Sequence, residues 1–91
     1  MSNTNAELDI IVQHNEYIIP IEVKSGGKGR LRSLHQFIDQ CNHHYGVRFL
    51  GNNFSVEKTK TISGKPFVLM NLPYFLATQI HNYIEWFVNN Y

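Results

Sequence analysis

Two apolar segments near the start of the chain are separated by a short polar turn, which is the pattern of a β-hairpin. Residues 8–13 and 17–24 are rich in isoleucine and valine, and the polar pair 15–16 lies between them. If this pair forms the turn, the numbers of opposing residues sum to 31. One face of the hairpin is then wholly apolar, whereas a one-residue slip would mix apolar and charged side chains. The pairs on the apolar face are Leu8–Val23, Ile10–Ile21 and Val12–Ile19.

The opposite face of this hairpin carries charged side chains. In the same register Asp9 lies opposite Glu22, and Glu7 lies opposite Lys24. Because directly opposed residues have Cβ atoms roughly 5 Å apart, two carboxylates there need a shared proton or a bridging cation. Mg²⁺ is a suitable bridge, since it binds carboxylate oxygens and keeps waters for a phosphate substrate. Together with a lysine that polarises water or holds phosphate, this pattern indicates metal-assisted phosphodiester hydrolysis.

An ordinary solvent-exposed strand face explains the same charges. Glu7 and Lys24 would then form a surface ion pair worth less than about 1 kcal/mol, and Asp9 and Glu22 would have no chemical role. The charge pattern by itself leaves both interpretations open.

The middle of the chain predicts one helix followed by short strands. Apolar residues recur at spacings of three and four from about residue 31 to 42, which predicts an amphipathic helix. Residues 47–50 form a short apolar run typical of a strand, and residues 54–61 alternate weakly. The turn signal at residues 63–66 precedes a further strand at 67–70. The apolar positions of the helix are Leu31, Leu34, Phe37, Ile38 and Cys41.

The last part of the chain predicts a long helix ending near Asn89. Asn71 is a suitable helix cap, and Pro73 is tolerated in a first turn. One side of this helix is apolar, and further aromatic residues lie outside that stripe. The whole order of elements predicts an α/β fold, with a mixed β-sheet and helices packed on it. The apolar side comprises Leu72, Leu76, Ile80, Tyr83, Ile84 and Phe87, and the additional aromatic residues are Tyr74, Phe75, Trp86 and Tyr91.

Composition narrows the class of protein without identifying it. Ninety-one residues suit a single domain, and 43% apolar residues with 13% aromatic residues exclude a disordered chain. A net charge of +1 gives no overall attraction to nucleic acid. The single cysteine, Cys41, suits a reducing cytoplasm, and no apolar run is long enough for a membrane span. We therefore expect a cytoplasmic protein without a membrane partner.

Asp9 and the tripeptide Glu22-Val23-Lys24 resemble the motif of the PD-(D/E)XK nuclease superfamily. Over about residues 7–80 the chain also resembles the C-terminal domain of unknown function of bacterial AAA-type ATPases. The segments that carry this resemblance are residues 7–9, 19–26 and 31–37. The resemblance implies a truncated PD-(D/E)XK nuclease-like fold, spanning residues 1–91 as the C-terminal part of a longer ATPase-type chain. It implies an ancestral Mg²⁺-dependent DNA endonuclease, in which Mg²⁺ or Mn²⁺ is bound by the two carboxylates. The implied catalytic residues are Asp9, Glu22 and Lys24, the implied metal ligands are Asp9 and Glu22, and Glu7 is an accessory ligand or the partner of Lys24.

The chain departs from this superfamily in two respects. Only six residues precede Glu7, so the helix and strand that normally come before the Asp-bearing strand are absent. The chain is then a fragment, or another molecule completes its fold. Some related nucleases carry a Gln-x-x-x-Tyr motif in the next helix, but the residue four positions after Gln36 is Gln40. Gln36 is retained only as a candidate accessory residue.

Basic residues follow the Glu-x-Lys motif, and DNA is the partner that they suggest. Lys28, Arg30 and Arg32 could meet a nucleic-acid backbone, although a soluble loop with a basic first helical turn explains them equally well. The pair His43-His44 lacks a second ligand pair at zinc-like spacing and is interpreted as polar residues at a helix end.

Three functional hypotheses remain open. The first is the metal-dependent nuclease. The second is a non-catalytic dimerisation or partner-binding module with a degenerate nuclease site, and the third is a DNA-contacting domain without cleavage. Because the C-terminal helix carries more aromatic surface than a small core requires, and an open sheet edge readily pairs, we expect a homodimer.

Overall fold

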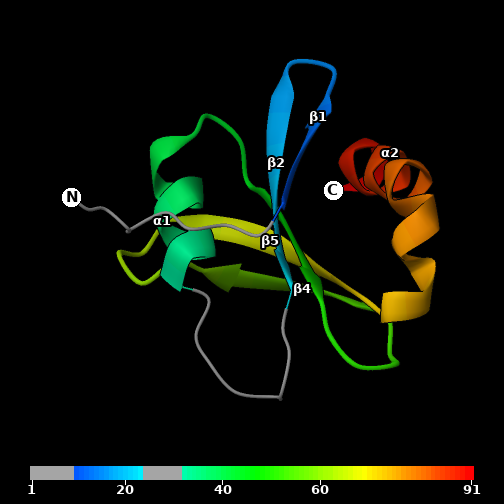
Figure 1. The fold of residues 1–91 in the computed structure, drawn as a ribbon. Helices are drawn as coiled ribbons and strands as arrows, with labels where there is room; N and C mark the ends of the chain where they lie inside the picture. Colours follow the sequence, from blue (N-terminus) through cyan, green and yellow to red (C-terminus); the bar gives the residue numbers. More distant parts are fainter. Residues whose placement is uncertain (1–9, 24–31) are drawn as a thin grey trace.

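A computed structural model describes residues 10–23 and 32–91 as one five-stranded sheet with helices on both faces. The strand order across the sheet is β1-β2-β3-β5-β4. Seen along the sheet edge, α1 covers one face and α2 covers the other (Figure 1). The predicted α/β class with a mixed sheet is therefore confirmed. The elements are β1 Ile10–His14, β2 Tyr17–Val23, α1 Arg32–Gln40, β3 Tyr45–Phe49, β4 Ser55–Lys60, β5 Pro66–Leu72, the 3-10 helix η1 Tyr74–Gln79 and α2 Ile80–Asn90.

The hairpin of β1 and β2 has the predicted register. Ile10 pairs with Ile21 and His14 pairs with Tyr17, so that opposing numbers sum to 31 throughout the described hairpin. Asn15 in the turn has φ of 56°, a left-handed conformation that asparagine tolerates better than most residues. The prediction that Ile10 joins an apolar core face is less well met, because this side chain is 45% exposed.

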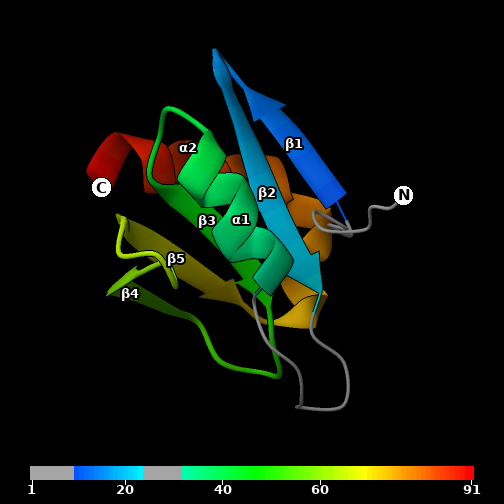
Figure 2. The same ribbon diagram turned by 90° about the vertical axis from the view of Figure 1, so that its left-hand side faces the viewer.

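Three strands of the sheet run parallel, and their carboxyl ends meet at one edge. β2 pairs in parallel with β3, and β3 pairs in parallel with β5. α1 makes the crossover from β2 to β3, as parallel neighbours require. Figure 2 shows that the beginning of α1 lies beside the carboxyl end of β2, because the helix runs back along the strand. This edge therefore gathers the ends of β2, β3 and β5 and the first turn of α1.

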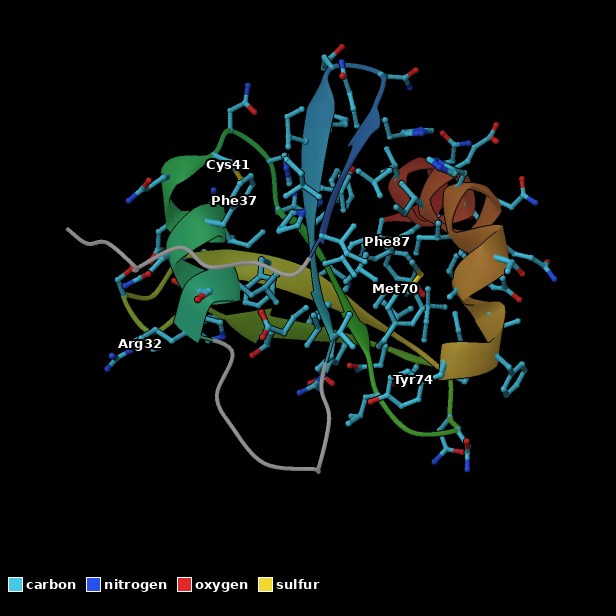
Figure 3. The ribbon with its side chains drawn as sticks, viewed as in Figure 1. Arg32, Phe37, Cys41, Met70, Tyr74 and Phe87 are labelled. Atoms are coloured by element: carbon cyan, nitrogen blue, oxygen red, sulfur yellow. The ribbon has the colours of Figure 1, made fainter. Side chains whose placement is uncertain are left out.

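The larger core lies between the sheet and α2. Ile84 and Phe87 of α2 are fully buried, and Figure 3 shows Phe87 and Met70 pointing toward each other between helix and sheet. Odd-numbered residues of β2 and β3 and even-numbered residues of β5 supply the sheet side, as strand alternation requires. The buried members are Ile19, Ile21, Tyr45, Val47, Phe49, Val68, Met70, Leu72, Ile84 and Phe87.

A smaller core lies under α1 on the opposite face. Leu34 and Ile38 of the helix pack on Phe67 and Leu69 of β5, and all four side chains are buried. Gly46 permits this close packing, because an added Cβ would lie 3.3 Å from the Phe67 ring and 3.5 Å from Leu34. Since both faces of the sheet are covered, the face of β2 that carries Glu22 is not a freely solvated hairpin face.

The end of α1 is fastened to the turn between β4 and β5. The Lys65 ammonium donates to the carbonyl oxygens of Ile38 (2.6 Å) and Cys41 (2.8 Å) at the end of the helix. Asp39 accepts hydrogen bonds from the hydroxyls of Thr61 and Ser63, each at 2.6 Å. These two hydrogen bonds are the main cause that lowers the pKa of the Asp39 carboxyl. The carboxylate and the ammonium thus hold α1 in place on the sheet.

The prediction for the C-terminal helix is wrong about where the helix begins. Asn71 is not a helix cap but part of β5, where its backbone pairs with Arg48 of β3. Pro73 follows with extended backbone (φ −67°, ψ 153°) and ends the strand, since proline has no N–H to donate. The segment after it is a 3-10 helix, and the α-helix begins only at Ile80. The third strand also begins earlier than predicted, at Tyr45.

In the part of the chain that the structure describes, none of the helices is both long and apolar enough to cross a membrane.

Candidate functional site

The described residues include three of the eight predicted site residues. Glu22 lies near the end of β2, Arg32 is the first residue of α1, and Gln36 lies one turn further along that helix. The other five predicted residues lie outside the described ranges 10–23 and 32–91. They are Glu7, Asp9, Lys24, Lys28 and Arg30.

Glu22 is half-buried at the carboxyl end of β2 and faces α1. Its neighbours Ile21 and Val23 pack in the core on the α2 side, so alternation along the strand turns Glu22 to the opposite face. The parallel register places Glu22 directly beside Arg48 of β3. Alternation and register together therefore place an acid and a base next to each other at the end of adjacent strands.

A row of polar side chains continues from Arg48 across the sheet. The Arg48 Nε donates to the Asn71 side-chain oxygen at 2.6 Å. The Asn71 amide nitrogen in turn donates to Ser55 Oγ at 3.0 Å and to Glu57 Oε2 at 2.7 Å. The guanidinium also lies 3.5 Å from Glu57 Oε2 as an ion pair. We call Arg48, Asn71, Ser55 and Glu57 the polar row.

The polar row lies where open α/β sheets usually bind their ligands. Arg48 and Asn71 lie in the last residues of two parallel strands, and Glu22 occupies the equivalent place on the third. In such sheets, ligands bind outside the carboxyl ends of the strands, near helix N-termini that attract anions. The sequence-based interpretation missed Arg48 and Asn71. The sequence did contain one signal for Arg48, because it is the only charged residue in the otherwise apolar strand Tyr45–Phe49.

The other two described site residues, Arg32 and Gln36, differ in their exposure to solvent. Arg32 is exposed, and Figure 3 shows it pointing outward from the first turn of α1. Gln36 lies about 200° around the helix from the core residue Leu34, at 100° per residue. Its Oε1 atom is buried without a hydrogen-bond partner among the described residues. Gln36 thus lies on the side of α1 away from Leu34, yet its side-chain oxygen is covered, and its assignment to the site stays a prediction.

A metal centre is not formed by the described residues alone. Within residues 10–23 and 32–91, no group of three or more histidine, cysteine, aspartate or glutamate side chains is arranged to hold a metal ion. Glu22 is the one predicted metal ligand that the structure describes, and the second predicted carboxylate, Asp9, lies outside the described residues. Carboxylate oxygens are suitable ligands for Mg²⁺ and Mn²⁺, and Glu22 is compatible with that chemistry.

His43 has a structural role instead of a role in zinc binding. Its Nδ1 accepts the backbone N–H of Tyr45 at 3.0 Å, so its Nε2 carries the proton and donates to the Ile18 carbonyl at 2.7 Å. Burial lowers the pKa of this imidazole, although the bond to Ile18 opposes the shift. The neutral ring therefore ties the segment before β3 to β2. His43 is buried, in contrast to the polar helix-end residue that the sequence suggested.

Comparison with known proteins identifies a family whose function has not been assigned. A family model described as a domain of unknown function, DUF4143, matches residues 1–75. This domain is typically found in proteins associated with AAA-type ATPases. No curated protein matches the chain. No solved structure matches it either.

Proposed function

Because this chain belongs to the DUF4143 family of AAA-ATPase-associated domains, we propose that it is a PD-(D/E)XK-like module that cleaves DNA with Mg²⁺ or Mn²⁺. The observation that carries this proposal is the placement of Glu22. It lies at the carboxyl end of a strand, on a half-buried polar face and beside an arginine. The hairpin register supports the proposal, since the same sum of 31 would pair Asp9 with Glu22.

The chemistry follows from the residues in the proposed site. Asp9 and Glu22 would hold the divalent ion, which would supply positive charge to the phosphate and lower the pKa of the attacking water. Lys24, on the same face as Glu22 by strand alternation, orients the attacking water or the scissile phosphate. Glu7 is an outer ligand or the partner of Lys24. The exposed Arg32, with Lys28 and Arg30, contacts the DNA backbone. A cytoplasmic location is part of the proposal, and the free cysteine suits it.

Calorimetry with Mn²⁺ and nicking of supercoiled plasmid test this function. The protein should bind Mn²⁺ and nick DNA, whereas Glu22→Gln, Asp9→Asn and Lys24→Met should each abolish nicking. The first two variants should also weaken Mn²⁺ binding, because each removes a negatively charged ligand. Glu16→Gln is the matched control, since Glu16 is an exposed acid in the turn at the opposite end of β2. Nicking that survives Glu22→Gln, or no Mn²⁺ binding at millimolar concentration, would refute the proposal.

A second candidate function is a dimerisation module, and exposed aromatic residues favour it. Phe54, Trp86 and Tyr91 are each more than 40% exposed and lie next to one another, with ring centroids 5.8 Å apart for Phe54–Trp86 and for Trp86–Tyr91. Phe54 also contacts Tyr83, at 6.0 Å. These four residues form the aromatic cluster, beside a depression of about 340 Å³. Aromatic residues gathered on one face are typical of interfaces.

Light scattering over a range of concentrations tests the homodimer. We expect a dimer at tens of micromolar, and Trp86→Ala should shift the equilibrium toward monomer. Phe75→Ala is the control, because Phe75 is 71% exposed and shows no ring contact with the aromatic cluster among the described residues. A monomer at all concentrations, or equal effects of both variants, would exclude dimerisation through the aromatic cluster.

A further inference from the structure

We propose that Arg48 binds a backbone phosphate of the DNA, as a fixed anion-binding residue of the same site. This inference rests on the proposed function for the identity of the ligand. It adds a residue that neither the nuclease motif nor the family assigns. The inference depends only on residues that the structure describes, namely Glu22 and the polar row.

The orientation of the Arg48 guanidinium is fixed by a neutral partner. Its Nε donates to the Asn71 side-chain oxygen at 2.6 Å, and Asn71 is only 4% exposed. Asn71 is fixed in turn by Ser55 and Glu57. A neutral amide orients the guanidinium without neutralising it. Among the described residues, neither terminal nitrogen of Arg48 has a hydrogen bond, and one of them lies 3.5 Å from the exposed Glu57 carboxylate, so a ligand that displaces this ion pair can accept from both.

The Arg48 side chain is buried enough to strengthen its attraction to an anion and exposed enough for a phosphate to reach it. Its side chain is 17% exposed, so the charge is partly desolvated yet still reachable. Arginine presents several donors in a rigid fork that matches the oxygens of a phosphate. Holding the fork in advance reduces the conformational entropy lost on binding. Glu22 on the adjacent strand places this fork next to the proposed metal ligand, so a bound phosphodiester would span both residues.

Glu57 is the competing anion at Arg48. Its Oε2 lies 3.5 Å from an Arg48 terminal nitrogen, but the side chain is 49% exposed and the pair is correspondingly weak. A phosphate approaching Arg48 is repelled by this carboxylate. Replacing Glu57 by glutamine would keep an oxygen to accept from Asn71 and remove the repulsion. A purely structural ion pair predicts no gain from that change, whereas a phosphate site predicts tighter binding.

Fluorescence anisotropy with a short labelled DNA duplex, in EDTA and at several salt concentrations, measures this site without cleavage. Arg48→Gln should weaken binding and reduce the magnitude of the log K against log salt slope by about 0.9, the value for one phosphate contact. Arg48→Lys should recover the slope but not the full affinity, since lysine keeps the charge and loses the bond from Nε. Lys58→Gln is the charge-matched control, because Lys58 is exposed on β4, next to Glu57 and therefore on the opposite face from the polar row.

Substitution of an acid near Arg48 should have the opposite effect and strengthen DNA binding. Glu57→Gln should tighten DNA binding several-fold more than Glu85→Gln, which removes the same charge from an exposed position on α2. Asn71→Ala should weaken binding without any change of net charge, because the guanidinium loses its fixed orientation. Circular dichroism melts of every variant separate loss of fold from loss of the site, and Arg48→Lys and Glu57→Gln keep the polar row most nearly intact.

The outcomes distinguish this inference from the proposed nuclease. Equal slopes for Arg48→Gln and Lys58→Gln, no gain from Glu57→Gln, or no DNA binding by the unmodified protein would each overturn the role of Arg48. Plasmid nicking that depends on Glu22 but is indifferent to Arg48 would leave the nuclease and remove the phosphate site. Arg48-dependent binding without Mn²⁺ binding or nicking would establish the phosphate site and refute the nuclease.

Discussion

Substitution of Lys65 by methionine should strongly destabilise the protein, because this lysine holds the end of α1. Its ammonium donates to two carbonyl oxygens at the helix end, Ile38 at 2.6 Å and Cys41 at 2.8 Å. Those carbonyls have no later helical N–H to pair with, although Ile38 also accepts a long bond from the Cys41 backbone at 3.4 Å. Methionine keeps most of the apolar stem of lysine and removes only the charged donor.

The expected cost follows from the strength of hydrogen bonds to charged groups. Each such bond contributes about 1.5–3 kcal/mol. Lys65 is partly exposed, so water can hydrate the released carbonyls, and we expect a loss nearer to about 2–3 kcal/mol in total. The whole domain is expected to have a free energy of unfolding of roughly 5–14 kcal/mol at this length. For a domain of this size the midpoint of thermal unfolding should fall by about 10–15 °C.

Urea unfolding followed by circular dichroism measures the change in the free energy of unfolding. Lys60→Met is the matched control, since Lys60 is exposed on the edge strand β4 and forms no hydrogen bond or ion pair with the described residues of α1. We expect the control to differ from the unmodified protein by less than about 0.5 kcal/mol, as is usual for surface positions. If Lys65→Met costs no more than Lys60→Met, the helix end is not held by this ammonium and the reasoning is refuted.

Two further predictions concern the core and the pH dependence of stability. Phe87→Ala should lower the free energy of unfolding by about 3–5 kcal/mol, because Phe87 is fully buried under α2, whereas Trp86→Ala should cost about 1 kcal/mol; equal costs in urea unfolding would contradict this. Burial lowers the pKa of His43 and of His35 in the folded protein. Below the ordinary histidine pKa of 6.5 the unfolded chain therefore binds more protons than the folded chain, and the free energy of unfolding should decrease as the pH falls. His43→Gln should flatten this dependence more than replacement of the exposed His81, and a urea midpoint that is constant from about pH 7.5 to about pH 5.5 would exclude the effect.

Local periodicity was sufficient to predict several elements. The β1–β2 register could be predicted because a two-residue turn and strand alternation leave one arrangement that separates apolar from charged side chains. The helix α1 could be predicted because Leu34 and Ile38 recur at helical spacing, and both are buried in the structure. The aromatic residues outside the helix stripe, such as Trp86, are exposed in the structure, in line with more aromatic surface than a small core requires, and their place in an interface stays a prediction.

The position of Asn71 was decided by contacts that are distant in sequence. As a local signal, an asparagine before Pro73 favours a helix cap. In the folded chain its backbone pairs with β3, and its side chain binds Arg48 and Ser55, which lie 23 and 16 residues away. The strand therefore continues through Asn71, because tertiary pairing satisfies more of its polar groups than a helix cap would.

The sequence alone thus determined the elements whose apolar pattern repeats locally, and the candidate acids and lysine of the hairpin. Only the tertiary structure brought Glu22 and Arg48 side by side, because parallel pairing of β2 and β3 depends on a crossover through α1. The polar row likewise exists only when β3, β5 and β4 are aligned in their observed order. Periodicity describes which face a residue takes on its own element, but the register between distant strands determines which residues meet.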